Sequence, residues 1–151
     1  MLRTIKRLLS GPQAEVRDAS GQETRQLQLA VAVLLHEARR ADYDEGDEES
    51  ATAQRSLAEI FGIERGEAAA LLAQGREKAQ QLTRFYAPVS VVKREFSLPE
   101  RIRLVEHLWR VAFTNGHLDL HEDHYVRKIA HLLYVPNTQS MLARNRARQS
   151  W

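Results

Sequence analysis

ADYDEGDEE at residues 41–49 and TNGHLDLHE at residues 114–122 are the two stretches of sequence that decide the fold. They lie about 73 residues apart, and each one follows an apolar helical stretch and precedes another. In each, an Asp or Asn stands seven residues before a Glu. These pairs are Asp42 with Glu49 and Asn115 with Glu122. The repetition predicts two related helix–turn–helix halves with oxygen-rich turns.

The composition is that of a single globular domain. The chain has 151 residues, of which 43% are hydrophobic and 28% are charged, enough to bury a core. It contains no cysteine, which excludes disulfides and thiolate metal sites. The longest apolar run, residues 29–35, is far shorter than the roughly 20 residues of a membrane span. We therefore expect a cytoplasmic protein.

Apolar residues recur at helical spacing through most of the chain, whereas strand signals are nearly absent. The sequence predicts an all-α fold, with about seven helices in two pseudo-repeated halves that pack as one bundle-like domain. Two of the expected helices lie at about 65–73 and 76–85, and the one weak strand signal is at residues 89–92. The helix expected at about 22–41 has the apolar stripe Leu27, Val31, Leu34, Leu35 and Ala38, and the helix expected to end at about 114 has Ile102, Val105, Leu108, Trp109 and Ala112. Ser97 and Glu100 have the spacing of a capping box at a helix start. The expected divisions are a short basic helix and linker at 1–21, the helical domain at 22–145 and a basic tail at 146–151.

The acidic stretches suit a hard cation. Asp42 and Asp44 follow the C-terminal end of a predicted helix, where the helix dipole disfavours negative charge. A bound cation would reverse that effect, because carboxylates and free carbonyls together form an oxygen cage. The sequence therefore predicts a Ca²⁺ or Mg²⁺ site. Its candidate ligands are Asp42, Asp44, Glu49, Asn115, Asp119 and Glu122.

Other interpretations of these stretches remain open. The first stretch is not an EF-hand loop, because Ala53 occupies the twelfth position counted from Asp42, and a solvated turn with helix-capping acids is the simpler alternative. In the second stretch the neutral amide of Asn115 predicts weaker cation binding, or none. His121 and His124 lie one helical turn apart and could share a Zn²⁺ ion, although exposed surface histidines are the simpler reading.

No pattern for catalysis or for nucleic-acid recognition occurs. The chain lacks a Gly-x-Ser-x-Gly elbow, a glycine-rich phosphate loop and a cysteine nucleophile, so we expect a non-enzymatic protein. The basic residues Arg110, Arg127 and Lys128 are scattered rather than clustered on a recognition helix. We therefore expect no nucleic-acid partner.

Several segments resemble the TerB-like family of tellurite-resistance proteins. They are residues 34–49 (LLHEARRADYDEGDEE), 61–63 (FGI), 82–85 (LTRF), 108–122 (LWRVAFTNGHLDLHE) and 126–133 (VRKIAHLL). The resemblance covers about residues 25–145, and its second half is the more specific.

The resemblance implies an all-helical fold of two pseudo-repeats with an acidic metal site, for calcium. It also implies a role in stress or tellurite response, with partner proteins at the inner face of a bacterial membrane. The residues that match the family's acidic positions are Asp42, Glu49, Asp119 and Glu122. This chain departs from the family pattern where Asp-Gly is usual, since it has Asp42-Tyr43 and Asn115-Gly116.

Two hypotheses of function follow. The first is a cytoplasmic interaction module whose acidic face binds a divalent cation and, through it, a protein partner or a membrane surface. The second is a membrane-surface adaptor that works without metal, through a basic amphipathic N-terminus. In that segment the basic residues Arg3, Lys6 and Arg7 lie opposite Leu2, Ile5, Leu8 and Leu9. Packing of this segment onto the core is a simpler use for so short a helix.

Overall fold

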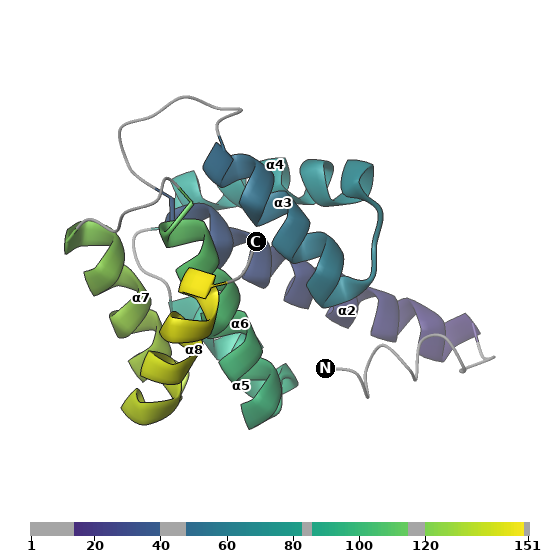
Figure 1. Cartoon of the computed structure of the whole chain (residues 1–151). Coiled ribbons are helices and arrows are strands. Elements are labelled where there is room, and N and C mark those ends of the chain that lie inside the picture. Colours follow the sequence, from purple (N-terminus) through teal and green to yellow (C-terminus); the bar gives the residue numbers. More distant parts are fainter. Residues whose placement is uncertain (1–13, 40–47, 83–85, 115–119, 150–151) are drawn as a thin grey trace.

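The computed structural model describes residues 14–39, 48–82, 86–114 and 120–149, which form seven helices and no strand (Figure 1). The helices are α2 (Ala14–Glu37), α3 (Glu48–Phe61), α4 (Arg65–Gln81), α5 (Tyr86–Glu95), α6 (Leu98–Ala112), α7 (Leu120–Leu132) and α8 (Asn137–Gln149). The prediction of an all-α fold is therefore confirmed. Residues 89–92, the one weak strand signal, lie within α5.

Helix α2 is the centre of the molecule. It contacts α3, α4, α5 and α6, whereas α7 and α8 pack on α6 and on each other (Figure 1). Every residue of its predicted apolar stripe is buried. These residues are Leu27, Val31, Leu34, Leu35 and Ala38. Helix α6 supplies the second half of the core, with Val105, Leu108 and Trp109 fully buried. One continuous hydrophobic cluster thus joins both groups of helices.

The start of α6 is fixed by the predicted capping box. The Glu100 amide donates to the Ser97 hydroxyl at 3.4 Å, and the Ser97 amide donates to the Glu100 carboxylate at 2.8 Å. Two amide groups that would lack helical partners are thereby satisfied. Pro99 lies in the first turn, where its missing N–H costs nothing.

Two predicted helix boundaries were wrong, both at glycines. Helix α2 begins at Ala14, so the expected linker before residue 22 is helical from that point. The predicted helices at 65–73 and 76–85 are the single helix α4, which runs through Gly75. Gly75 is buried against α2, and a Cβ atom there would lie 2.7 Å from the Cβ of Ala32. The glycine therefore permits a close helix crossing rather than ending a helix.

The arrangement contains two helix–loop–helix pairs, α2–α3 and α6–α7, and the helices within each pair contact each other. Each pair flanks one of the acidic stretches. An origin of the two halves by duplication stays a prediction.

Candidate functional site

The C-terminal end of α2 and the N-terminal end of α7 are joined by a hydrogen bond. The Tyr125 hydroxyl donates to the Leu34 carbonyl at 2.8 Å across 91 residues of sequence. Burial raises the pKa of the Tyr125 hydroxyl well above its ordinary value, and the charge of Glu37 raises this pKa further. Because α2 leads into the first acidic stretch and α7 follows the second, the helix ends that flank both stretches meet at one end of the molecule. We call this the acidic end.

Glu49 and Glu122 are buried in the first turns of α3 and α7. Their exposed fractions are only 2% and 3%, whereas the neighbouring Glu48 is exposed. Both residues take part in interactions, and the positive end of each helix dipole favours a carboxylate there. The seven-residue spacing found in the sequence thus leads, in both halves, to a buried glutamate at the start of the second helix.

The other four predicted ligands, Asp42, Asp44, Asn115 and Asp119, lie outside the described residues. Within the part of the chain that the structure describes, no three His, Asp or Glu side chains are grouped so as to hold a metal ion. The residues of the suggested zinc pair, His121 and His124, are both exposed on α7.

Glu37 is an acidic residue at this end that was not among the predicted ligands. It is half-buried in the last turn of α2, where burial raises the pKa of its carboxyl group and the Arg39 guanidinium partly opposes that shift. It lies close enough to Tyr125 for its charge to act on the phenol. Its place in the acidic run was visible in the sequence, but its position beside α7 was not.

His36, one residue before Glu37, lies at the same end of α2, and its imidazole is neutral. Burial lowers its pKa to about 4, and the positive charges of Arg39 and Arg76 add to this effect. Nδ1 of its ring therefore accepts a hydrogen bond from the Arg39 guanidinium at 3.0 Å. A neutral imidazole adds no positive charge against the nearby carboxylates.

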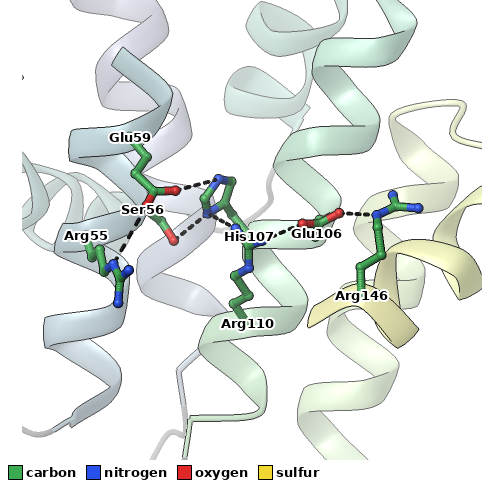
Figure 2. Close-up of polar contacts among 7 residues, drawn as sticks. All are labelled: Arg55, Ser56, Glu59, Glu106, His107, Arg110 and Arg146. Atoms are coloured by element: carbon green, nitrogen blue, oxygen red, sulfur yellow. Dashed lines mark hydrogen bonds and ion pairs between the residues drawn. The ribbon is translucent and has the colours of Figure 1, made fainter. Parts of the chain in front are cut away.

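A second polar cluster connects α3, α6 and α8 (Figure 2). The Ser56 hydroxyl lies 2.8 Å from Nδ1 of His107, and Nε2 of His107 lies 3.9 Å from the Glu59 carboxylate. These residue types also occur in hydrolase triads, but Ser56 and His107 are fully buried on packed helix faces, where no substrate can reach the hydroxyl. Burial lowers the pKa of His107 to about 3, with further lowering from Arg110 and Arg103. The cluster therefore has a structural role, in which its polar contacts join α3 to α6.

The same cluster continues to the last helix. Glu106 accepts from Arg110 within α6 and from Arg146 of α8 (Figure 2). Helix α8 extends to Gln149 and buries Ala147. The arginine at the start of the expected basic tail is therefore engaged by an acidic partner within the fold.

The basic N-terminal segment on which the membrane-adaptor hypothesis depends lies outside the described residues. Among the helices that the structure does describe, none is long and apolar enough to cross a membrane.

Comparison with known proteins gives one family. Residues 28–145 match the family model described as tellurite resistance protein TerB. No curated protein matched the chain significantly. No solved structure did so either.

Proposed function

Because the chain belongs to the TerB family of tellurite-resistance proteins, we propose that it is a non-enzymatic interaction module of a cytoplasmic stress response. In this proposal its acidic end binds a divalent cation. The observation that carries the proposal is the equivalent burial of Glu49 and Glu122, each at the start of the helix that follows an acidic stretch.

The physical argument rests on the cost of burying charge. A carboxylate withdrawn from water needs hydrogen-bond donors or a cation to offset its lost hydration. Helix dipoles and contacts within the fold supply part of this for Glu49 and Glu122. The half-buried Glu37 adds a third acidic group near the same helix ends. Within the described residues these carboxylates are not grouped so as to hold a metal ion by themselves, so the proposal requires further oxygen ligands from the two acidic stretches.

Calcium suits this set of ligands better than magnesium. Ca²⁺ accepts six to eight oxygen ligands in flexible geometry, whereas Mg²⁺ demands a near-ideal octahedron and retains water. The proposed ligands are Glu49 and Glu122 with Asp42, Asp44, Asn115 and Asp119 of the acidic stretches. Calcium would then reduce the negative charge of residues 37–49, which hold seven acidic residues and two arginines. We propose that this change controls the docking of a protein partner or of a membrane surface.

The test is calorimetric titration of the metal-stripped protein with Ca²⁺, Mg²⁺ and Zn²⁺. We expect saturable binding of Ca²⁺ that weakens at least tenfold in Glu49→Gln and in Glu122→Gln. Glu48→Gln is the matched control, because it removes one exposed carboxylate beside Glu49 and should leave the affinity nearly unchanged. Absence of Ca²⁺ binding, or equal weakening in the control, contradicts the proposed ligands.

Thermal unfolding separates a metal-binding role from a structural one. At a free Ca²⁺ concentration of about 100 times Kd, the native state gains about 2.7 kcal/mol, which corresponds to a rise in Tm of roughly 5–10 °C for a chain of this size. Glu49→Gln should lose most of that rise while unfolding normally in EDTA. A variant that is destabilised equally in EDTA and in Ca²⁺ would assign Glu49 to the fold alone.

A further inference from the structure

A cleft of about 510 Å³ lies between α5 and the C-terminal end of α7. This volume is within the range of small-molecule sites. The cleft begins about 17 Å along α7 from the first residue of that helix, Leu120, given a rise of 1.5 Å per residue. Its lining residues are Val89, Ser90 and Lys93 of α5, and His131, Leu132 and Tyr134 at the end of α7.

Tyr134 holds an uncommon backbone conformation at the rim of this cleft. Its φ is +57°, in the left-handed region that non-glycine residues rarely adopt. The Tyr134 amide donates to the His131 carbonyl at 3.0 Å, and the Val135 amide donates to the Ala130 carbonyl at 2.9 Å. These two bonds form the Schellman motif that ends α7, and Tyr134 occupies the position where glycine is usual.

The same chain builds the equivalent end of α3 with glycine. Gly62 has φ +63°, and the Ile63 amide donates to the Ala58 carbonyl at 3.2 Å. The strain at Tyr134 is therefore not required to end a helix in this fold. The tyrosine ring is also 72% exposed, so burial in the core does not offset the strain. A strained backbone with an exposed aromatic ring is typical of a residue retained for binding.

The polar side chains that line the cleft can all donate hydrogen bonds. The Lys93 ammonium lies over the Tyr134 ring, 4.3 Å from its centroid. Ser90 is one turn from Lys93 on the same face of α5, and the His131 ring carries at least one N–H donor. None of the lining residues is acidic. An ammonium, an imidazole and a hydroxyl from two helices suit an oxyanion with several acceptor oxygens.

We propose that this cleft binds a small phosphorylated ligand with a planar ring, the phosphate at Lys93, Ser90 and His131 and the ring against Tyr134. The shared chemistry is that of a nucleoside monophosphate and of an aryl phosphate. The apolar side chains of Val89 and Leu132 form the remaining wall. The site is independent of the acidic end and needs no metal.

The experiment is an NMR titration of the full chain with phenyl phosphate as the probe. We expect saturable shifts at the backbone amides of Lys93, His131 and Tyr134. Inorganic phosphate should bind about three- to tenfold more weakly, because it lacks the stacking ring. Adenosine monophosphate and phosphotyrosine then distinguish a nucleoside monophosphate from an aryl phosphate. The probe that binds more tightly identifies which of these two classes the cleft recognises. No saturable shift with any of these probes overturns the proposal.

Two variants test the assigned roles. Lys93→Met should weaken phenyl phosphate binding tenfold or more, whereas Lys78→Met, an exposed lysine beside a different groove, should not. Tyr134→Gly should weaken binding three- to tenfold and also raise Tm by about 2–4 °C, because glycine relieves the strain. Unchanged binding in both Lys93→Met and Tyr134→Gly overturns the site, and a lower Tm in Tyr134→Gly overturns the strain argument on which it rests.

Discussion

Substitution of Gly75 by alanine tests the central helix crossing of the fold. A Cβ atom at this position would lie 2.7 Å from the Cβ of Ala32, 2.8 Å from the Ala32 carbonyl carbon and 3.0 Å from the Val33 nitrogen. Two of these three atoms belong to the backbone of α2, so no side-chain rotation removes the clash. The two helices would have to move apart along a crossing lined by core residues.

The expected magnitude follows from two opposing terms. Alanine gains about 1 kcal/mol over glycine in a helix interior. Overpacking of a buried site costs about 1–3 kcal/mol, and a clash with backbone belongs at the upper end. We therefore expect Gly75→Ala to lower the free energy of unfolding by about 1–2 kcal/mol. For a chain of this length, that corresponds to a fall in Tm of about 2–8 °C.

The assay is equilibrium unfolding in urea, with Gly66→Ala as the matched control. Gly66 lies in the same helix, but a Cβ atom there would have no neighbour within 4 Å. The control should therefore be as stable as the unsubstituted protein or up to about 1 kcal/mol more stable. If Gly75→Ala behaves like Gly66→Ala, the close approach of α4 to α2 is wrong.

Three further predictions concern polar groups of the fold. The pKa of His107 is lowered to about 3, so its stabilising contribution is full above its unfolded pKa of about 6.5 and is lost as the pH falls toward 3, by up to about 1.4 kcal/mol per pH unit. Urea unfolding between pH 7 and 4 should accordingly show a shallower loss of stability in His107→Gln. Tyr125→Phe removes the donor to the Leu34 carbonyl and should cost about 0.5–1.5 kcal/mol in urea unfolding at pH 7. Ser97→Ala removes half of the capping box and should cost about 0.5–2 kcal/mol, measured by thermal unfolding.

Each of these three predictions has a control variant or a result that would contradict it. An identical pH slope in His107→Gln and the unsubstituted protein would mean that the imidazole is not held neutral by burial. The control for Tyr125→Phe is Tyr134→Phe, which alters an exposed tyrosine and should change the free energy of unfolding by less than about 0.5 kcal/mol. If Tyr125→Phe loses no more stability than this control, the hydrogen bond to the Leu34 carbonyl is contradicted. Full stability of Ser97→Ala would contradict the capping role.

The helical class and the buried faces were predictable because hydrophobic period is a local property. The apolar stripes of α2 and α6 repeat every three to four residues, and their members are buried except Ile102 of α6, which is partly buried. Helix boundaries at glycine were not predictable in the same way. The local sequence predicts that a helix ends near Gly75, because glycine disfavours a helix interior. Only the close approach to Ala32, 43 residues earlier in the chain, explains why α4 contains a glycine at this position.

The candidate site was predictable in part. The seven-residue spacing singled out Glu49 and Glu122, and both are buried. The hydrogen bond from Tyr125 to Leu34 spans 91 residues, and that between His107 and Ser56 spans 51. No local pattern encodes such pairs, so the meeting of α2 with α7 emerged only from the structure.

The central position of α2 has a consequence for synthesis of the chain. Of the described helices α2 is made first, yet the helices that cover its apolar stripe end as late as residue 112. At about 5–20 residues per second, some 75 residues take roughly 4–15 seconds to follow Glu37. During that interval a fully apolar face, from Leu27 to Ala38, has no complete set of partners on the ribosome-bound chain. Burial of this face is therefore complete only after α6 has been made, and until then α2 is a target for a chaperone that binds exposed apolar helices.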